Sequence, residues 1–343
     1  MTIKAAIAAL VDGAHLTIDE AGAVMTEIMA GDATPAQIGA FLTALRIKGE
    51  TVDEITGCAR AMRRFALPVR PQRTDLIDTC GTGGDRSGTF NISTTVAFVV
   101  AGAGLGVAKH GNRSVSSQSG SADVLQALGL NLDLEPERVA ASIDSVGFGF
   151  LFAPKLHPAM RYAIGPRGEM GIRTVFNLLG PLCNPAGART QVIGVYSHAM
   201  IQPLAGVLKS LGSRAAYVVH GADGLDELST TGVNQVAYFD EDSDMVIMGT
   251  LDGADFGLAR PQLSDLKGGT AEENAALTRA VLDGERGPRR DVVLLNAAAA
   301  LVAAGKAATL REGIAAAADI VDSGAARRTL DRAIEFSRDH APA

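Results

Sequence analysis

Residues 81–85, with the sequence Gly-Thr-Gly-Gly-Asp, could hold an anionic group. Glycines let a backbone approach a ligand closely, with several N–H groups directed at it. A helix is expected to begin near residues 91–94, and the free N–H groups and positive dipole end of a helix also favour phosphate. An ordinary turn between a strand and a helix would have a similar composition, so these residues alone leave both interpretations open.

Residues 109–121 form a second polar segment, which begins Lys-His-Gly-Asn-Arg and continues with several serines. It follows another expected strand, and open α/β sheets bind ligands outside the carboxyl ends of their strands. Lys109 and Arg113 would bring positive charge to such a site, and the serines would bring hydroxyl donors. Taken alone, the segment would be a solvated loop that ends in a helix N-cap at Ser121. Together with residues 81–85, it indicates a pocket for a polyanion.

Asp226 and Glu227 are neighbouring carboxylates that follow a further expected strand. Mg²⁺ is typically held by one or two carboxylates together with substrate oxygens, so this pair is a candidate metal site. The alternative is a polar turn with exposed acids, but the position of the pair at a strand end of the same sheet favours the metal. The glycine cluster lacks the Lys-Ser/Thr ending of a P-loop and the spacing of a dinucleotide fingerprint. An ATP motor and a dinucleotide enzyme are therefore weak alternatives.

The elements that must position these groups fall into two regions. Residues 1–70 have the signals of a helical region, and the proline-containing segment 67–71 predicts a linker after it. Potential capping boxes that start two of the helices are Thr17 with Glu20 and Thr51 with Glu54.

After the linker, apolar segments alternate with helical ones. Short segments that predict strands are 76–79, 105–109, 148–152, 191–196, 215–220 and 235–239. Helices are expected between several of them, including 93–103 and 121–128. This alternation predicts an α/β domain with a mostly parallel central sheet. The alanine-rich tail, 273–338, is expected to be helical, with breaks near Gly287 and Gly305.

The composition fits a folded protein and argues against nucleic acid or a membrane as a partner. The chain has 343 residues, of which 47% are hydrophobic and 4% aromatic, and a formal net charge of −7. Such a chain can bury a core but lacks the aromatic and basic surface typical of nucleic-acid binding. It begins without a secretory signal, and its most apolar stretch, 96–107, is too short to span a membrane. Three cysteines without a CxxC pair fit a reducing compartment, so we expect a cytoplasmic protein.

Five motifs of the chain resemble those of the anthranilate phosphoribosyltransferases, a family of tryptophan biosynthesis. They are GTGGD at 81–85, NIST at 91–94, KHGNRSVSS at 109–117, GSAD at 120–123 and HGADGLDE at 220–227. The resemblance covers nearly the whole chain, with the motifs in the expected order and spacing. It implies a small helical N-terminal domain, residues 1–70 completed by a helical segment around 168–188. It also implies a large α/β domain, residues 72–343, with the fold of nucleoside phosphorylases and phosphoribosyltransferases, and a homodimer formed through the helical domain.

The resemblance further implies an activity and a set of site residues. The enzyme would transfer the phosphoribosyl group of phosphoribosyl pyrophosphate (PRPP) to the amine of anthranilate, giving N-(5-phosphoribosyl)anthranilate and pyrophosphate. Residues that would contact PRPP are Gly81, Gly84, Asp85, Thr89, Asn91, Ile92, Ser93, Thr94, Lys109, His110, Gly111, Asn112, Arg113, Ser114, Val115, Ser116, Ser117 and Ser121. Those that would hold anthranilate are Gly81, Asn112 and Arg167. Two Mg²⁺ ions per monomer would be held by Ser93, Asp226 and Glu227.

The chemistry of this reaction requires positioning rather than a strong base. The attacking aromatic amine is neutral at pH 7, and the oxocarbenium-like transition state needs its leaving pyrophosphate stabilised by Mg²⁺ and backbone donors. We therefore expect no covalent intermediate and assign no certain catalytic residue. His110, Asn112 and Arg167 are expected to position the substrates. The planar guanidinium of Arg167 would bind the carboxylate of anthranilate.

Several of these residues also have plainer interpretations. Arg167 could lie on the surface, His110 could simply pack beside the glycines, and His157 could simply cap a helix. Cys80, next to the glycine cluster, is expected to be a packing residue rather than a nucleophile, because no histidine base is paired with it. Two other functions are alternatives. A pyrimidine nucleoside phosphorylase would need a base-binding set that is not found here, and a nucleic-acid-binding homologue would need a basic surface.

Overall fold

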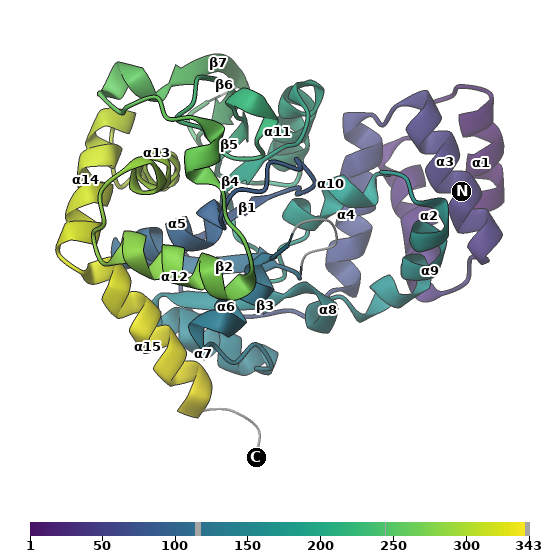
Figure 1. Ribbon diagram of the computed structural model, residues 1–343. Coiled ribbons are helices and arrows are strands. Elements are labelled where there is room, and N and C mark those ends of the chain that lie inside the picture. The colour runs from purple at the N-terminus through teal and green to yellow at the C-terminus, as the bar shows by residue number, and fades with distance from the viewer. Residues whose placement is uncertain (114–117, 244, 340–343) are drawn as a thin grey trace.

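The computed structural model describes residues 1–113, 118–243 and 245–339, which form a helical lobe and an α/β lobe (Figure 1). The predicted fold class is confirmed: a small helical N-terminal domain adjoins a large α/β domain with a mostly parallel sheet. None of the helices in the described part of the chain is long and apolar enough to cross a membrane.

The helical lobe combines helices from two parts of the chain. They are α1 (Ile3–Val11), α2 (Ile18–Ala30), α3 (Pro35–Lys48), α4 (Val52–Phe65), α9 (Arg161–Met170) and α10 (Phe176–Leu182). Thr17 and Thr51 start α2 and α4 with the predicted capping boxes. α2 and α4 can lie close together because Gly57 has no side chain. A Cβ atom there would lie 2.2 Å from the carbonyl oxygen of Ile18. α9 packs against α2 and α3, and α10 packs against α4.

The α/β lobe is built on a seven-stranded sheet with the strand order β3-β2-β1-β4-β5-β6-β7. The strands are β1 (Leu76–Gly81), β2 (Gly106–Gly111), β3 (Phe148–Phe152), β4 (Thr190–Gly194), β5 (Ala215–His220), β6 (Val233–Phe239) and β7 (Ile247–Asp252). The first five strands of that order are parallel, whereas β6 pairs antiparallel with β5 and β7 pairs antiparallel with β6. β7 is not among the predicted strands, because it forms an exposed edge without a regular burial pattern.

The strand order reverses between β1 and β4. After β1 the chain adds β2 and β3 on one side, and it then returns to add β4 to β7 on the other. In open α/β sheets, ligands bind outside the carboxyl ends of the strands at such a switch point. Gly81, the last residue of β1, lies in register with Gly194, the last residue of β4. From this topology we expect the site at the segment that follows Gly81.

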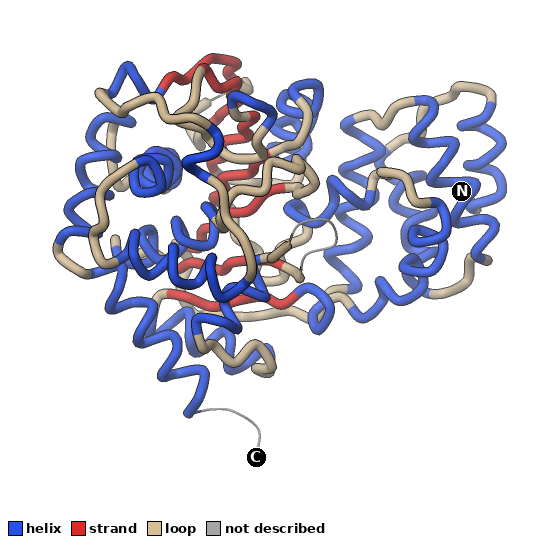
Figure 2. The backbone as a smooth tube through the Cα atoms, viewed as in Figure 1, coloured by secondary structure: helices blue, strands red, loops and turns tan. Residues whose placement is uncertain are grey.

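Helices cover both faces of the sheet, whose strands are red in Figure 2. One face packs against α5 (Ile92–Gly102), α13 (Pro288–Ala303) and α15 (Ala325–Asp339). The other packs against α11 (Ile201–Ser210), and this core is continuous with that of the helical lobe through α4. The remaining helices are α6 (Ser121–Leu128), α7 (Pro136–Val146), α8 (Ala153–Leu156), α12 (Ala271–Leu282) and α14 (Leu310–Asp322). Short 3₁₀ turns are η1 (Pro158–Met160), η2 (His198–Met200), η3 (Ala222–Gly224), η4 (Gly253–Phe256) and η5 (Leu263–Leu266). The C-terminal helices break as predicted near Gly287 and Gly305.

Candidate active site

Glycines at the ends of β1 and β4 make room for the loop that follows β5. A Cβ atom on Gly194 would lie 1.5 Å from the carbonyl oxygen of Asp226, and one on Gly81 would lie 2.3 Å from Oδ2 of the same residue. Neither glycine has a positive φ angle, so space rather than backbone freedom requires glycine here. The loop of residues 221–229 therefore packs directly on the switch point and brings Asp226 and Glu227 to it.

Asp226 and Glu227 of this loop each accept a hydrogen bond from the backbone of another segment of the site. The N–H of Gly83 donates to Asp226 Oδ2 at 2.6 Å, and the N–H of Ser93 donates to Glu227 Oε1 at 3.1 Å. The glycine loop after β1, the first turn of α5 and the acidic loop after β5 thus converge.

Burial raises the pKa of both carboxyl groups. The pKa of Asp226 rises well above its usual range through burial and then through the charges of Asp85 and Glu227. Burial raises the pKa of Glu227 to about 7, although Lys109 and the bonds from Ser93 act against this shift. The carboxyl groups of Asp85, Asp226 and Glu227 therefore bring more negative charge to this place than Lys109 balances, and such a site suits a divalent cation. Because no three His, Cys, Asp or Glu side chains are grouped for a metal within the described ranges, Mg²⁺ would also need the Ser93 hydroxyl or substrate oxygens.

The buried side chain of Lys109 extends from β2 to the start of α5. Its Nζ atom donates to the carbonyl oxygen of Thr79 at 2.5 Å and to Ser93 Oγ at 3.4 Å. Burial lowers the pKa of Lys109, and the charges of Asp78 and Glu227 act in the opposite direction. The ammonium group therefore lies beside the candidate metal and phosphate ligands rather than in solvent.

Four of the residues expected to bind PRPP, Asn91, Ile92, Ser93 and Thr94, lie at the first turn of α5. Asn91 Nδ2 donates to the carbonyl oxygen of Ser119 at 3.3 Å, and Asn91 Oδ1 accepts from Asn274 Nδ2 at 2.9 Å. The hydroxyl of Thr94 is buried and has no hydrogen-bond partner among the described residues, so it is available to a ligand. The side chain of Ile92 belongs to the core, which leaves only its backbone for a ligand. Asn274 was missed in the sequence because only the fold brings α12 to this turn.

Local bonds hold the rest of the glycine loop. Asp85 Oδ2 accepts a hydrogen bond from Ser87 Oγ at 2.6 Å, and Thr89 forms an isolated β-bridge with Lys267. A Cβ atom on Gly88 would lie 3.7 Å from Lys267 Nζ, so this exposed ammonium group lies next to the loop. Lys267 is a second residue that sequence reasoning missed, since no motif contains it.

His110 and His157 form a buried pair of neutral imidazoles. Their Nε2 atoms are 3.1 Å apart, and His110 Nδ1 lies 3.0 Å from the carbonyl oxygen of Gly180. Only a protonated Nδ1 can bond to that carbonyl, so His157 Nε2 donates to His110 Nε2. Burial lowers the pKa of His110 to about 3 and that of His157 to about 4. His157 also lies at the N-cap position of η1, but its side chain makes no capping bond there and its ring faces His110.

The end of β2 packs against the start of α6. A Cβ atom on Gly111 would lie 2.3 Å from Ser121 Oγ, which donates to the carbonyl oxygen of Asn112 at 3.2 Å. The guanidinium of Arg113 donates to Asp123 at 2.7 Å and is thereby paired on α6. The predicted residues that lie outside the described part of the chain are Ser114, Val115, Ser116 and Ser117.

Two arginines of the helical lobe face the site differently. The guanidinium of Arg167 on α9 lies 5.0 Å from the ring centroid of Phe176, and burial lowers its pKa. Arg173, between α9 and α10, donates a hydrogen bond to the carbonyl oxygen of Gly84 and lies 3.8 Å from the ring centroid of Tyr196. The structure thus brings Arg173 onto the glycine loop and Arg167 onto Phe176. Arg173 was missed because it is far in the chain from both polar segments.

Cys80 packs at the base of the glycine loop, as expected. Its side chain is buried, and its Sγ atom donates to Asp78 Oδ2 at 3.7 Å. Burial and the charge of Asp78 raise the pKa of this thiol well above its usual range. A thiol that keeps its proton is a poor nucleophile.

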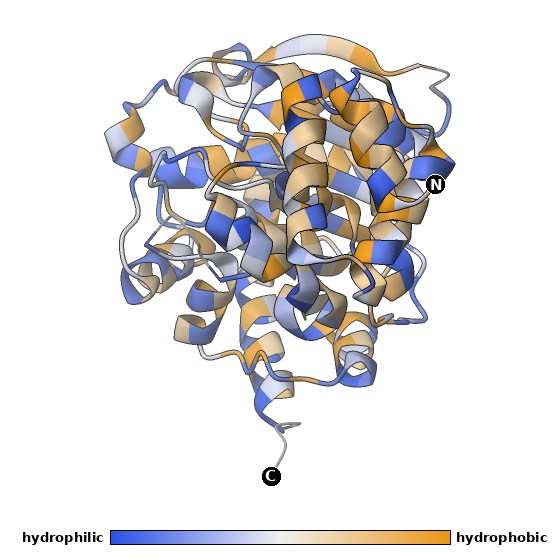
Figure 3. Ribbon diagram, turned by 90° about the vertical axis from the view of Figure 1, so that its right-hand side faces the viewer, coloured by the Kyte–Doolittle hydropathy of each residue, from blue (hydrophilic) through white to orange (hydrophobic). Residues whose placement is uncertain are grey.

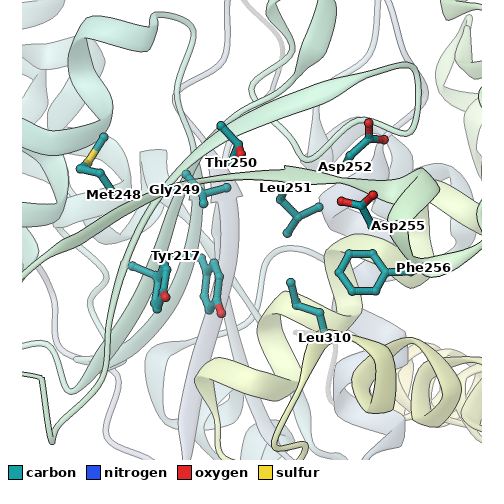
Figure 4. A pocket seen from close by; sticks show the side chains of 11 residues that line it. Tyr217, Met248, Gly249, Thr250, Leu251, Asp252, Asp255, Phe256 and Leu310 are labelled. Carbon is teal, nitrogen blue, oxygen red and sulfur yellow. The ribbon is translucent and has the colours of Figure 1, made fainter.

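A hollow of about 250 Å³ lies elsewhere, at the outer strands of the sheet (Figure 4). It is lined by residues of β5, β6 and β7, and Tyr217 stacks there against Tyr238 with 5.2 Å between ring centroids. Of the predicted site residues that the structure describes, none lines this hollow. Chemistry rather than volume therefore identifies the converging loops as the candidate site.

Comparison with known proteins covers most of the chain. Residues 4–66 match a family described as "Glycosyl transferase family, helical bundle domain", and residues 73–327 match "Glycosyl transferase family, a/b domain". The anthranilate phosphoribosyltransferase of Moorella thermoacetica is 59% identical over 334 residues, which cover 97% of this chain and 98% of that protein.

Solved structures of similar proteins share the whole architecture. The anthranilate phosphoribosyltransferase of Thermus thermophilus has a TM-score of 0.92 and 47% identity, covering 97% of this chain and 99% of that one. The Saccharomyces cerevisiae protein in complex with PRPP and Mg has a TM-score of 0.89 and 29% identity, covering 98% of both chains. The yeast protein has also been solved in complex with 4-fluoroanthranilate.

Proposed function

The chain belongs to the anthranilate phosphoribosyltransferase family, and we propose that its reaction takes place where the glycine loop, the start of α5 and the acidic loop converge. The enzyme transfers the phosphoribosyl group of PRPP to the amine of anthranilate and gives N-(5-phosphoribosyl)anthranilate and pyrophosphate, in tryptophan biosynthesis. One observation carries the proposed location: Gly83 and Ser93 donate backbone hydrogen bonds to Asp226 and Glu227. Membership of this family excludes both alternative functions, that of a nucleoside phosphorylase and that of a nucleic-acid-binding homologue.

We assign the diphosphate of PRPP to the glycine loop and the first turn of α5. The backbone N–H groups there are donors, and Lys109 Nζ lies 3.4 Å from Ser93 Oγ, which brings positive charge to the same place. The unpartnered hydroxyl of Thr94 supports this assignment. The other PRPP contacts, including residues 114–117, rest on the motifs. A relative of this fold in complex with PRPP and Mg supports the ligand class.

We propose two Mg²⁺ ions per monomer, held by Ser93, Asp226 and Glu227. The ions would neutralise charge that develops on the leaving pyrophosphate. Two observations support this donor set. The carboxylates are buried with too few positive charges around them, and the bond from the N–H of Ser93 to Glu227 brings Ser93 beside these acids.

We assign anthranilate to the region between the end of β2 and the helical lobe. Arg167 would bind its carboxylate, and Gly81 and Asn112 would contact the ring and the amine. His110, whose ring is fixed by His157, is neutral and can orient the acceptor without protonating its amine. The yeast relative in complex with 4-fluoroanthranilate supports an acceptor site in this fold.

The domain limits and the assembly are further parts of the proposal. We divide the chain into a helical domain, residues 1–70 with about 168–188, and an α/β domain, residues 72–343. Two copies would pair through the helical domain, where Ile47 is 81% exposed and Val11 is 72% exposed. The helices of this lobe face the viewer in Figure 3 and carry both hydrophobic and hydrophilic residues. The free thiols of all three cysteines support a cytoplasmic location.

One assay tests the proposed function. Purified protein is mixed with PRPP, MgCl₂ and anthranilate, and the loss of anthranilate fluorescence is followed. We expect loss only when all four components are present, with release of one pyrophosphate per anthranilate consumed. Related aromatic acids serve as acceptor controls. Unchanged fluorescence with folded protein would contradict the proposal.

A further inference from the structure

We propose that Asp78 is a positioning residue of this enzyme. Its buried carboxylate links the strand end that carries Lys109 and His110 to Asn184, in the segment that returns from the helical lobe. Through this link it sets the geometry between the diphosphate side and the acceptor side of the site. The inference rests on the proposed function, and it concerns a residue that has no assigned contact with substrate or metal.

Asp78 lies within β1, and its side chain is 0% exposed. Its Oδ1 atom accepts a hydrogen bond from the N–H of His110 at 3.2 Å. Its Oδ2 atom accepts from Asn184 Nδ2 at 2.8 Å and from Cys80 Sγ at 3.7 Å. Burial of a carboxylate is costly even when it is hydrogen-bonded, and an apolar side chain would pack in a strand at lower cost. Packing of the strand therefore does not explain why a carboxylate stands at position 78.

Asn184 uses its whole amide group as a bridge. Its Nδ2 atom donates to Asp78 and to the carbonyl oxygen of Ala108 in β2, each at 2.8 Å, and its Oδ1 atom accepts from the N–H of Ala186 at 2.9 Å. Asn184 comes shortly after α10, where the chain leaves the helical lobe for β4. The Asp78–Asn184 bond thus joins two strands of the site to the connection between the lobes.

Other hydrogen bonds gather the lobe connections at the same place. The N–H of Val69, in the linker after α4, donates to the carbonyl oxygen of Pro185 at 3.1 Å. The N–H of Leu67 donates to the carbonyl oxygen of Leu156 at 2.8 Å. The segments that connect the lobes are therefore bonded to one another. A displacement of residue 184 would therefore also move these connecting segments, and with them the arginines of the helical lobe.

Charge also couples Asp78 to the diphosphate side. Burial raises the pKa of Asp78 to about 6, and the positive charge of Lys109 acts against this shift. The hydrogen-bond acceptors of the Lys109 ammonium group, the carbonyl of Thr79 and the hydroxyl of Ser93, are both neutral. Asp78 thus supplies negative charge that helps to hold this buried ammonium group in place.

An amide in place of the carboxylate would keep the shape of Asp78 and lose one of its bonds. Both carboxylate oxygens face donors, namely the N–H of His110 and the Nδ2 of Asn184. In Asp78→Asn, either orientation of the new amide would set an NH₂ group against a donor. Asn184→Ala removes the other partner and leaves Asp78 unchanged. The two variants therefore test the same bond from its two ends.

Steady-state kinetics of Asp78→Asn, Asn184→Ala and the double variant test the inference, at a temperature well below each Tm. We expect each single variant to lower kcat/KM for anthranilate by about 10- to 100-fold, the effect of a misplacement of roughly 1 Å. The double variant should lose no more than the more affected single variant, because both changes break one bond. Calorimetric binding of PRPP with Mg²⁺ should weaken in Asp78→Asn and change little in Asn184→Ala, since only Asp78 acts on Lys109.

Glu54→Gln is the matched control. Glu54 is also a fully buried carboxylate, and its partners Leu16, Lys48 and Thr51 all belong to the helical lobe. This variant should lower the Tm and leave kcat and both KM values unchanged. A merely structural role of Asp78 would give the same pattern.

Several outcomes would overturn the inference. They are a folded Asp78→Asn variant with wild-type kcat/KM for anthranilate, and single-variant effects that multiply in the double variant. If Asp78→Asn does not fold, Asn184→Ala decides, and wild-type kcat/KM in that variant contradicts the link. Turnover by the wild-type protein separates the two proposals. Its absence contradicts the proposed function, whereas normal turnover with unaffected variants contradicts only the role of Asp78.

Discussion

The N–H of Gly83 donates a hydrogen bond to Asp226 Oδ2 at 2.6 Å, although the two residues are 143 positions apart in the chain. The bond joins the glycine loop to the acidic loop, which are separate motifs in the sequence. Both loops follow strand ends next to the switch point of the sheet, so strand order decides that they meet. A change that displaces one loop is therefore expected to displace the other.

Gly194→Ala should move the acidic loop away from the strand ends. The new Cβ atom would lie 1.5 Å from the carbonyl oxygen of Asp226, so residues 221–229 would have to shift together with both carboxylates. We expect kcat/KM to fall by about 100-fold and the free energy of unfolding to fall by about 1–3 kcal/mol. The fluorescence assay and thermal melts measure the two effects.

Gly206→Ala on α11 is the matched control for this change. A Cβ atom there would meet the Val52 methyl groups at 3.6 and 3.7 Å, which is ordinary contact, so full activity is expected. Wild-type turnover in Gly194→Ala would show that the acidic loop does not depend on the end of β4.

Without added metal, in EDTA, the protein should become less stable as the pH rises from about 4.5 to about 7. Glu227 has a pKa raised from 4.5 to about 7 by burial, so its proton is held more tightly in the folded than in the unfolded state. The stabilisation is complete below the unfolded pKa and is lost as the pH rises through the folded pKa. Glu227→Gln should flatten this dependence in thermal melts. MgCl₂ should raise the Tm at pH 8 in the wild type more than in the variant.

Glu54→Gln should show the opposite dependence on pH. Burial alone would raise the pKa of Glu54, but the N–H groups of Leu16 and Thr51 and the ammonium of Lys48 lower it overall. Such a group stabilises the folded state above its unfolded pKa, and the effect is lost as the pH falls through the lower folded pKa. The variant should therefore lose stability at pH 8 and much less at pH 3. Equal pH dependence in the Glu54 and Glu227 variants would contradict their assignment to opposite environments.

Arg167→Ala should weaken anthranilate far more than PRPP. A guanidinium that binds a carboxylate through two hydrogen bonds contributes about 1.5–3 kcal/mol, which corresponds to about 10- to 100-fold in KM for anthranilate. The KM for PRPP should change little. Initial rates with each substrate varied in turn measure both constants. Equal losses for the two substrates would show that Arg167 does not bind the carboxylate.

Local motifs predicted the separate parts of the site because each part is a strand, a loop and a helix start. The glycine loop with α5 and the segment after β2 are such units, and their turn and cap residues are readable in order along the chain. Strand order is not local, so the sequence alone could not show which loops would touch. The bond from Gly83 to Asp226 is one consequence of that order.

Residues that act through distant contacts left no signal in the sequence. The pairing of His157 with His110 joins positions that are 47 residues apart, and no spacing rule predicts it. Asn184 appears as a polar residue after a helix, and only the folded chain sets its amide between β1 and β2. Arg173 reaches Gly84 across 89 positions. Short-range patterns predict secondary structure but carry no information about such long-range partners.

Arg173→Ala should affect PRPP more than anthranilate, the reverse of the effect expected for Arg167→Ala. Arg173 donates to the carbonyl of Gly84 and stacks on Tyr196, so its loss frees the glycine loop that is assigned to the diphosphate. A charge-assisted bond of this kind contributes about 1.5–3 kcal/mol, and the KM for PRPP should rise about 10- to 100-fold. Arg173→Lys should recover little, because an ammonium group lacks the planar surface that stacks on the ring. Arg161→Ala, which removes an exposed arginine stacked on Tyr162, is the control and should keep both KM values. A rise in the KM for anthranilate alone would place Arg173 on the acceptor side of the site instead.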